Sequence, residues 1–550
     1  MSSDVRNDVS VSRVALPQPV QEADATAPEK LEVPFAPTPA QSGVAPKLAH
    51  GGSGAVTQMA QLRSSGAVVT ASVTSASKLP AVTKSEGPQP VEIPGVSAKA
   101  RELGKLSATE TAAAIRSGEL SRQEVVEAAI ERAEASQGTI HGIASRLYDR
   151  ARAQAAGPGN GGPLDGVPTA IKDIVPLEGL ITTYGSEGTP RIPAKQTSDA
   201  VRDFEGLGGI SIARSTSSEF GYTCTVEPPG KPPTRNPYDL TRSAGGSSGG
   251  AASLVAAGVI SYAHTTDGGG STRIPANWCG LYGMKPTRGR QTSLASAKKM
   301  PVEINAAGAV TRTAEDLAAV MHGLDRGALS GMRPLGLVEG PSNERLRVGF
   351  YIDPLDGKSD PDVARAVLKT AEELEKQGHI VEEMKPPYDE SFVRDFLQHY
   401  ALIALITELK LRFTDGADIE KLEPFSRDLA NLAKKPLNLL TMPFNVWRLD
   451  RFEHEYAKIF ESRDIVLSPT TATTAPELGH LSPEIDFDTH LERLLKIVAF
   501  TPLQNGSGGP ALSVPSGFSE DGLPIGVQLA SNLGEDRRLI ELAFALKDYR

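Results

Sequence analysis

The sequence predicts an α/β fold, built as one large domain that follows a disordered N-terminal tail. Short apolar segments of strand length alternate with segments of helical apolar spacing from about residue 105 onward. No long Pro/Gly/Ser linker interrupts the chain after Gly289, so no boundary to a second domain is indicated. We therefore expect a tail over residues 1–104 and a single domain over residues 105–550.

The first hundred residues have the composition of a segment that does not fold by itself. They are rich in Ala, Val, Ser and Pro, and Phe35 is their only aromatic residue. Such a segment buries too little apolar surface to offset the loss of chain entropy. A linker or tail is the simplest interpretation, and an arm that binds a partner or contacts another copy of the chain is the alternative.

Two helices are predicted at the start of the domain. Ser107 and Glu110 have the Ser-x-x-Glu spacing of a capping box, and the same spacing recurs at Ser121 and Glu124. Gly118 separates the two helices. The second helix is expected to pack on a core through one apolar face, which comprises Val125, Val126, Ala129 and Ile130.

Strands and helices alternate through the rest of the chain. Strands are expected over residues 168–174, 210–214, 347–352, 380–383, 465–467 and 511–514. Helices are expected over residues 200–207, 360–376, 392–413 and 440–462, and a buried helix is expected to start near Ala251. The strand, helix and strand between residues 347 and 383 have the order of a βαβ unit.

The charge balance and the cysteine content exclude several classes of protein. Lys and Arg number 57 against 67 Asp and Glu, a net charge of −10, which argues against binding to nucleic acid or to an anionic membrane. The two cysteines, Cys224 and Cys279, are too few for a disulfide framework or a cysteine zinc site. The apolar run over residues 251–263 is shorter than the roughly 20 residues that span a membrane. The N-terminus does not resemble a signal peptide, so we expect a cytoplasmic protein.

Two segments rich in glycine and serine lie close together in the middle of the chain. The first, GGSSGG at residues 245–250, precedes a strongly apolar run, which argues against a flexible linker. The second, DGGGS at residues 267–271, offers several backbone N–H groups beside the Ser271 hydroxyl, as acyl transfer requires for a tetrahedral oxyanion. Neither segment matches Gly-x4-Gly-Lys-Ser/Thr or Gly-x-Gly-x-x-Gly, the patterns of phosphate-binding loops. Ser271 is therefore a candidate nucleophile.

A serine nucleophile needs a base near neutral pH, and two residues are candidates for that role. His264 is the nearest histidine, but it lies inside an apolar run and is better explained as a core residue. Lys172 ends the apolar segment GVPTAIK, where burial would lower its pKa and favour the neutral amine. A surface lysine that caps a strand is the alternative, and this segment alone leaves both interpretations open.

Four segments in this order resemble the amidase signature family: GVPTAIKD, RNPYDLTRSAGGSSGGAA, TTDGGGSTRIPA and CGLYGMKPTRGR. The spacing of Lys172, Ser247 and Ser271 agrees with the Lys-Ser-Ser triad of that family. The resemblance spans roughly residues 105 to 548 and leaves only the N-terminal tail outside it.

This resemblance implies a fold and a mechanism. The fold would be a mixed, twisted central sheet with helices on both faces. Lys172 would be the base, Ser247 the bridging serine that follows a cis peptide bond, and Ser271 the nucleophile that forms an acyl-enzyme. The oxyanion would be stabilised by the backbone N–H groups of Gly268, Gly269, Gly270 and Ser271. No metal or organic cofactor is implied.

Residues around these motifs are expected to support them. Asp267 and Arg273 flank the nucleophile, and we expect them to pair or to bond its backbone and so hold its loop open. Cys279 is expected to be a small buried residue. The stretch before RNPYDL lines the acyl pocket in relatives, which makes it a candidate for substrate binding, and ordinary packing would explain it equally well. It contains Phe220, Gly221, Tyr222 and Cys224.

Within the family, DGGGS is closer to stand-alone hydrolases that resemble 6-aminohexanoate-cyclic-dimer hydrolase than to the A subunit of glutamyl-tRNA(Gln) amidotransferase, which has Asp-Thr-Gly-Gly-Ser. The C-terminal segment over residues 500–529 also resembles the stand-alone enzymes. Gln504 and Gly509 replace the usual Phe and Gln there, and these two changes would reshape the pocket. The membrane-binding segment of the fatty acid amide hydrolase branch is not found in this sequence.

The sequence therefore predicts an amidohydrolase that cleaves a linear, non-peptide carboxamide to a carboxylic acid and an amine or ammonia. The substrate would be a small soluble amide, without nucleic acid or membrane as a partner, and the base rate for soluble enzymes favours a homodimer. One alternative is the glutaminase-type A subunit of the amidotransferase. A more remote alternative is a non-catalytic scaffold protein, against which the intact set of Lys172, Ser247 and Ser271 argues.

Overall fold

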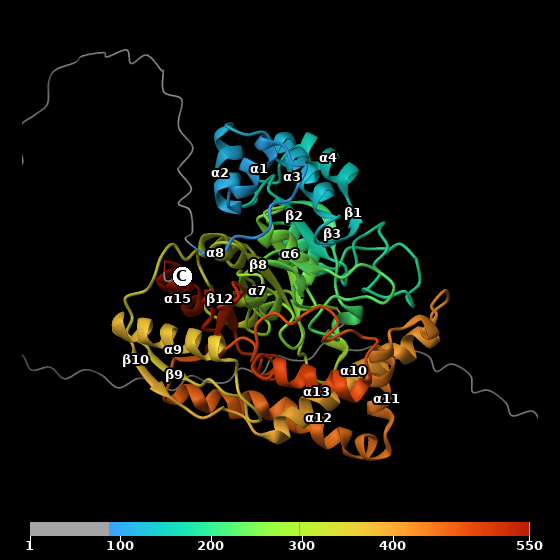
Figure 1. The fold of residues 1–550 in the computed structure, drawn as a ribbon, viewed down its shortest axis with the longest axis vertical. Helices are drawn as coiled ribbons and strands as arrows, with labels where there is room; N and C mark the ends of the chain where they lie inside the picture. Colours follow the sequence, from blue (N-terminus) through green and yellow to red (C-terminus); the bar gives the residue numbers. More distant parts are fainter. Residues whose placement is uncertain (1–86, 296, 549–550) are drawn as a thin grey trace, which may run out of the picture. The chain divides into compact units, whose positions relative to one another are not determined.

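A mixed sheet of eight strands forms the centre of the fold (Figure 1). The computed structural model describes residues 87–295 and 297–548. The strands lie in the order β10-β9-β11-β13-β12-β7-β8-β6, with β10, β9 and β11 parallel and the remaining neighbours antiparallel. Their bounds are β6 Tyr262–Asp267, β7 Tyr282–Lys285, β8 Ala306–Thr311, β9 Arg347–Phe350, β10 Ile380–Glu383, β11 Ile465–Pro469, β12 Ala511–Phe518 and β13 Pro524–Ala530. The predicted mixed α/β fold is confirmed.

A second sheet of three strands continues the fold beyond β6. Strand β3 (Ile210–Ser215) lies between β1 (Ile143–Arg146), which is antiparallel to it, and β2 (Pro168–Lys172), which is parallel to it. The Thr169 hydroxyl donates to the carbonyl of Tyr262 at 2.9 Å, which joins β2 to β6. Every residue of β2 and of β6 is buried, so the two strands meet inside the protein. A short hairpin of β4 (Arg235–Asn236) and β5 (Asp239–Ser243) follows.

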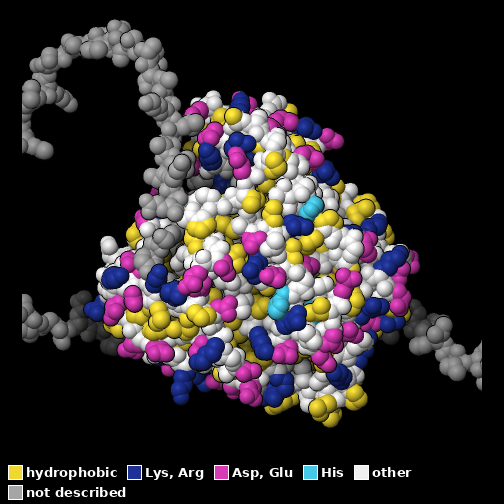
Figure 2. All heavy atoms as spheres, in the orientation of Figure 1, with side chains coloured by type: hydrophobic (Ala, Val, Ile, Leu, Met, Phe, Trp, Pro, Cys, Tyr) yellow, Lys and Arg dark blue, Asp and Glu magenta, His cyan; other side chains and the backbone are white. Residues whose placement is uncertain are grey.

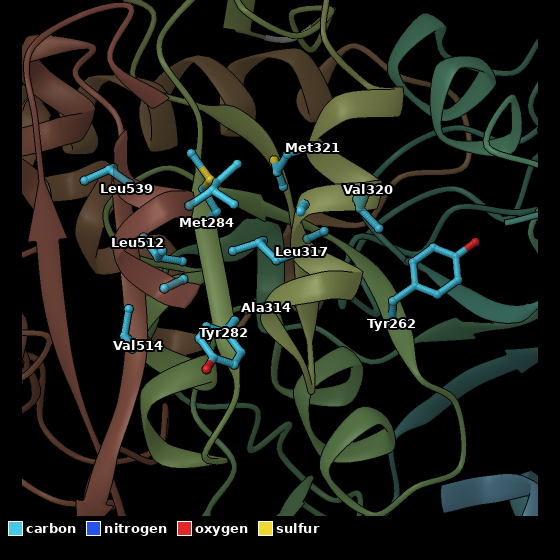
Figure 3. Close-up of a cluster of buried hydrophobic side chains, with 14 of the residues drawn as sticks. Tyr262, Tyr282, Met284, Ala314, Leu317, Val320, Met321, Leu512, Val514 and Leu539 are labelled. Atoms are coloured by element: carbon cyan, nitrogen blue, oxygen red, sulfur yellow. The ribbon is translucent and has the colours of Figure 1, made fainter. Parts of the chain in front are cut away.

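Helices cover both faces of the large sheet. On one face, α8 (Ala314–Gly323), α9 (Pro361–Lys376) and α15 (Asp536–Leu546) pack on a core in which Met284, Leu317 and Leu512 point toward one another (Figure 3). On the other face, α7 (Arg273–Trp278) lies against β7, β12 and β13. Gly283 faces α7 so closely that a Cβ there would lie 2.4 Å from the Cβ of Ala276. Helix α6 (Gly249–Ala256) is buried on all its residues.

The predicted capping boxes are both present. The Ser107 and Ser121 side chains accept hydrogen bonds from the N–H groups of Glu110 and Glu124, and both glutamates bond back to the N-cap backbone. The helices are α2 (Ala108–Ser117), which ends at the left-handed Gly118, and α3 (Arg122–Ser136). The predicted face of α3 is buried, and α4 (Tyr148–Ala156) packs against the same helix. Helix α5 (Asp199–Glu205) lies where a helix was expected.

The ordered part begins earlier than the sequence predicted. Helix α1 (Ala98–Lys105) lies inside the predicted tail, with Ser97 as its N-cap. Ile93, Val96 and Ala100 are buried in a cluster with Ala128 of α3. The Ala/Pro/Ser-rich composition of the whole segment concealed these few apolar residues, which fold because α3 offers them a partner surface. The remainder of the predicted tail, residues 1–86, lies outside the described residues.

Further helices follow the βαβ unit as expected, and they are α10 (Glu390–Arg412), α11 (Pro424–Lys434), α12 (Pro436–Ala457), α13 (Phe487–Ile497) and α14 (Pro502–Ser507). Helix α12 starts before the predicted residue 440 because Pro436 occupies its first turn, where a proline needs no N–H partner. Pro443 lies within the same helix. Among the helices of the described residues, none is long and apolar enough to cross a membrane.

Candidate active site

Lys172 lies at the end of β2 with its amine buried among hydroxyl groups. Its Nζ is 2.6 Å from Oγ of Ser247 and 3.0 Å from Oγ1 of Thr266. Burial lowers the pKa of Lys172 to about 7, and the more distant charge of Asp267 only partly opposes that shift. Of the two interpretations that the sequence left open, Lys172 is therefore the buried lysine and not a surface strand cap. Near neutral pH a large fraction of it is an uncharged amine that can accept a proton.

Ser247 reaches Lys172 from a tightly packed loop that precedes α6. The peptide bond between Gly246 and Ser247 is cis. Gly246 fits only because it lacks a side chain, since a Cβ there would lie 2.6 Å from the backbone N of Thr225. Gly221 adopts a left-handed φ of +80° and lies close to Ser247, with a Cβ position 3.1 Å from the Ser247 Oγ. The position of Ser247 beside Lys172 thus depends on glycines from two separate segments.

Ser271 lies in the loop between β6, which ends at Asp267, and α7, which starts at Arg273. Its side chain is buried except for 7% of its surface, and together with Gly269 it lines a cavity. Gly270 before it adopts a φ of +126° and adjoins Thr501, whose Oγ1 would lie 2.3 Å from a Cβ at that position. This conformation is open to glycine and strained for other residues.

Asp267 and Arg273 form a buried ion pair across the nucleophile loop, as the sequence analysis expected. The guanidinium donates to both carboxylate oxygens at 2.9 and 2.8 Å, and both side chains are fully buried. Although burial alone would raise it, the charge and hydrogen bonds of Arg273 hold the pKa of Asp267 well below its usual range. The same carboxylate accepts the N–H groups of Gly270 at 2.8 Å and of Thr272 at 3.2 Å. The ion pair therefore fixes the backbone on both sides of Ser271.

This arrangement changes the predicted set of oxyanion donors. The N–H of Gly270 is already donated to Asp267, so it does not point to a site where a substrate oxygen could bind. Within the described residues, the N–H groups of Gly269 and Ser271 have no hydrogen-bond acceptor. Both residues line the cavity. Gly268, Gly269 and Ser271 are the predicted donors that the geometry leaves available.

A group of polar residues from α14 and β13 forms hydrogen bonds with Arg273. Most of these residues were not predicted from the sequence. Arg273 donates to Gln504 at 2.9 Å, to Gln528 at 2.7 Å and to Asn505 at 2.7 Å. The Thr501 hydroxyl donates to the carbonyl of Gly269 at 2.6 Å. These residues follow the nucleophile by more than 200 positions, and no local pattern links them to it.

Gln504 and Gly509 do not line the cavity. The effect on the pocket that the sequence predicts therefore does not come from direct contact with it. Gln504 accepts from Arg273 and donates to the Tyr456 hydroxyl at 2.8 Å. At Gly509, a Cβ would lie 3.1 Å from the carbonyl of Ser531. Because α14 is buried behind Arg273, Gln504 acts on the loop that carries Ser271 and not on the pocket wall.

The cavity beside Ser271 has a volume of about 670 Å³. Its wall is mostly apolar and comes from α10, α11 and α13 together with the segment around Tyr222. Charged side chains among the lining residues are Asp356, Glu390, Arg394, Glu492 and Lys496. An aromatic row runs along the wall, with ring centroids 5.8 to 6.1 Å apart, and consists of Tyr222, Tyr400, Phe396, Phe392 and Tyr388.

Most of the predicted substrate-binding residues line the cavity, and one of them packs beside the lining residues. Gly221, Tyr222 and Cys224 line the cavity. Phe220 does not, because its ring packs between Tyr184 at 6.2 Å and Tyr222 at 5.6 Å. The carbonyl of Gly221 accepts the Tyr400 hydroxyl at 2.9 Å, which ties this segment to α10.

His264 and Cys279, the other residues considered from the sequence, are both buried in the core. His264 is buried in β6 against Phe204, and burial lowers its pKa to about 3. Cys279 is fully buried, its Sγ donates to the carbonyl of Ala244 at 3.4 Å, and burial raises its pKa. In the part of the chain that the structure describes, no group of three or more His, Cys, Asp or Glu side chains is placed to hold a metal ion.

Comparisons with known proteins agree on one family. The sequence model of the Amidase family matches residues 124–540. The AmiC protein of Mycobacterium tuberculosis, named as an amidase, is 39% identical over 453 residues, which cover 82% of this chain and 95% of that protein. The 6-aminohexanoate-cyclic-dimer hydrolase of a Pseudomonas species is 31% identical over 479 residues, covering 80% of this chain and 94% of that protein. A solved structure of 6-aminohexanoate cyclic dimer hydrolase with substrate matches with a TM-score of 0.73 and 29% identity, over 82% of this chain and 97% of that one.

Proposed function

This chain belongs to the amidase family, and we propose on that premise that it hydrolyses an apolar carboxamide through an acyl-enzyme on Ser271. The observation that carries the proposal is the buried contact between Lys172 and Ser247, next to a serine loop that lines an apolar cavity. A scaffold protein would have no need for a lysine with a pKa near 7 at 2.6 Å from a serine hydroxyl.

In the acylation step, the neutral amine of Lys172 takes the proton of the Ser247 hydroxyl while Ser247 takes the proton of Ser271. The Ser271 oxygen forms a bond to the amide carbon, and the carbonyl electrons move to the oxygen. The resulting oxyanion is stabilised by backbone N–H groups, for which Gly269 and Ser271 are the best placed. Each donor of this type is worth about 2.7 to 4 kcal/mol.

Collapse of the tetrahedral intermediate breaks the bond between carbon and nitrogen. The proton held by Lys172 returns through Ser247 to the departing amine, which leaves as ammonia or a neutral amine. Water then attacks the ester on Ser271 by the same route, with Ser247 and Lys172 again accepting its proton. The products are a carboxylic acid and free Ser271, so no external oxidant, reductant or nucleotide enters the balance.

The cavity favours an amide whose acyl or amine portion is apolar. Its wall is mostly aromatic and aliphatic and gains from contact with an apolar group. Glutamine, whose amino and carboxylate groups are charged, would depend on the few charged lining residues, such as Arg394 and Glu390, and is the substrate of the glutaminase-type alternative. A linear aliphatic amide or an anilide is the substrate class that we expect.

Product analysis by mass spectrometry tests the proposal. Purified protein would be incubated with a series of aliphatic amides, anilides, amino-acid amides and glutamine. We expect turnover of the apolar amides, and a loss of at least about four orders of magnitude in Ser271→Ala. Ser271→Ala thereby excludes a contaminating hydrolase, and Ser211→Ala, a change at a buried serine on β3, controls for a general effect of removing a buried hydroxyl and should retain activity. Turnover confined to glutamine would contradict the substrate class and support the amidotransferase alternative.

A further inference from the structure

Helix α12 carries an apolar stripe that no other part of the described chain covers. Leu437, Leu440, Phe444 and Trp447 follow one another at intervals of three and four residues, which places them on one face of the helix. Their exposed fractions are 69%, 80%, 56% and 52%. We call these four residues the α12 stripe. In Figure 2 apolar side chains reach the surface along the lower edge of the molecule, where Figure 1 places α12.

The α12 stripe is not the face through which α12 packs on the protein's own core, because another face of the helix is already buried there. Met442, Leu449 and Tyr456 point inward, and α12 packs there on α10, α11 and α14. The exposed aromatic rings are also held in place. Phe444 and Trp447 stack at 5.8 Å, with the guanidinium of Arg448 4.9 Å from the Phe444 ring and that of Arg451 5.0 Å from the Trp447 ring. Such a patch marks an interaction surface.

The order of residues along the α12 stripe is symmetric about Met442. Leu440 and Phe444 lie equally far on either side of it, as do Leu437 and Trp447. Beyond the stripe, the exposed Lys435 and Asp450 lie seven and eight residues from Met442 and carry opposite charges. A two-fold axis through this point would place each leucine of one copy against an aromatic ring of the other, and each lysine against an aspartate.

We propose that two copies of this chain associate through the α12 stripe as an antiparallel helix pair, with the two-fold axis beside Met442. Isologous contacts of this kind are the commonest in soluble oligomers, and they require a patch that complements itself. Lys435 of one copy then lies near Asp450 of the other at both ends of the pair. The antiparallel arrangement also brings the helix dipoles into favourable alignment.

The charges of α12 disfavour a lipid surface as the occupant. A membrane-bound amphipathic helix is rich in Lys and Arg around its apolar face. Here Asp450, Glu453 and Glu455 share the helix with Arg448 and Arg451, and the whole chain has a net charge of −10. A second copy of the chain can use both signs of charge, whereas an anionic bilayer would be repelled by the acidic ones.

The mass of the full chain in solution tests the proposal directly. Light scattering should give about twice the chain mass of 58.0 kDa at micromolar concentration. The double variant Leu440→Asp with Phe444→Asp should be monomeric, because each aspartate would be buried without a partner. The matched control Ile192→Asp with Leu329→Asp changes two exposed apolar residues outside the α12 stripe and should remain dimeric.

A cysteine at the axis gives a second test that does not depend on the stability of the double variant. Both native cysteines, Cys224 and Cys279, are buried, so an introduced surface thiol reacts alone. Pro443→Cys should form a disulfide-linked dimer on mild oxidation, whereas Glu455→Cys, which lies 13 residues from Met442 along the same helix and so far from the axis, should not. A monomeric parent chain, or a dimer that survives the double variant and gives no cross-link at residue 443, overturns the proposal. Sedimentation of a monomer with anionic vesicles also overturns it and would assign the α12 stripe to a membrane.

Discussion

The side-chain nitrogen of Lys172 lies 2.6 Å from the hydroxyl oxygen of Ser247, although 75 residues separate them in the chain. The lysine ends a buried strand, and the serine sits on a glycine loop that only close backbone packing allows. Burial at this contact lowers the pKa of Lys172 to about 7. The predictions below follow from this lysine and from the loop beside it.

The Lys172 base predicts that activity is lost as the pH falls. The pKa of Lys172 is about 7, so the amine is protonated below that value and cannot accept the proton of Ser247. We expect kcat/KM to rise from pH 5 to pH 8 with a midpoint near pH 7. Replacing Lys172 with Met should lower activity by about 10² to 10⁴ and remove the midpoint.

Lys285 provides a matched control for that profile. It is equally buried, its pKa is also lowered to about 7 by burial, and its Nζ donates to the carbonyl of Pro286 at 2.8 Å. The variant Lys285→Gln should therefore keep the rise of kcat/KM with pH. A profile that disappears in Lys285→Gln and persists in Lys172→Met would contradict the assignment of the base.

The ion pair of Asp267 and Arg273 predicts a large loss of stability when one partner is removed. Asp267→Asn would leave a fully buried guanidinium without its counter-charge, and breaking a buried pair in this way costs about 3 to 5 kcal/mol. Chemical denaturation of the parent and the variant measures this difference. Glu205→Gln, at the partly exposed pair with Arg150, should change the stability little.

The same ion pair predicts a change in catalysis that is separable from stability. Asn at position 267 could still accept one of the N–H groups of Gly270 and Thr272, but not hold Arg273 with two charged oxygens. We expect kcat to fall more than KM changes for the substrate, measured at a temperature where the variant is folded. An unchanged kcat in folded Asp267→Asn would show that the loop around Ser271 does not depend on this carboxylate.

The apolar cavity predicts selectivity for the size of the substrate. Leu429 on α11 lines the cavity, and Leu429→Trp would fill part of its volume of about 670 Å³. We expect kcat/KM to fall by about 10-fold or more for a bulky anilide and to change little for acetamide. Leu432→Trp, on the same helix and outside the lining, is the control. Equal losses for both amides would argue that the bulky group binds elsewhere.

Two neighbouring carboxyl groups, the buried Glu219 and the half-buried Glu423, predict that stability falls as the pH rises. Glu219 accepts the backbone N–H of Glu423 at 2.9 Å, and burial together with the charge of Glu219 raises the pKa of Glu423 to about 9. The folded protein thus binds a proton that the unfolded chain releases above its ordinary pKa of 4.5. The stabilising effect of that proton is complete at low pH and is lost as the pH rises toward about 9.

Glu423→Gln removes this titration and is the variant that checks it. At pH 8.5 we expect it to be more stable than the parent chain by on the order of 1 to 3 kcal/mol, and at pH 5 to differ much less. Denaturant titrations at the two pH values measure the difference, with the exposed Glu420→Gln as control. A difference that is the same at both pH values would contradict the raised pKa.

Local patterns predicted the elements around the site well because their causes are local. The capping boxes of Ser107 and Ser121 form as the spacing indicates, and the strand that ends at Lys172 is buried along its whole length. The resemblance to the family then selected Lys172, Ser247 and Ser271 from among many candidates. A buried lysine alone would have left the choice between base and strand cap open.

The residues that sequence analysis missed act over long distances. Asn505 bonds Arg273 from 232 positions away, and its role depends on β12 and β13 bringing α14 behind the nucleophile loop. The occupied N–H of Gly270 could not be foreseen either, because it follows from the orientation of the Asp267 carboxylate. Half of the residues that line the cavity come from α10, α11 and α13, whose apolar faces look like ordinary core in the sequence.

The central claim is that Ser271 forms a covalent acyl-enzyme, and mass spectrometry of the trapped intermediate tests it most directly. The protein would be mixed with a slowly hydrolysed anilide, quenched in acid within seconds and digested. The mechanism predicts a peptide that carries the acyl group on Ser271, absent from Ser271→Ala and strongly reduced in Lys172→Met. An acyl group on another residue, or full turnover by Ser271→Ala, would contradict it.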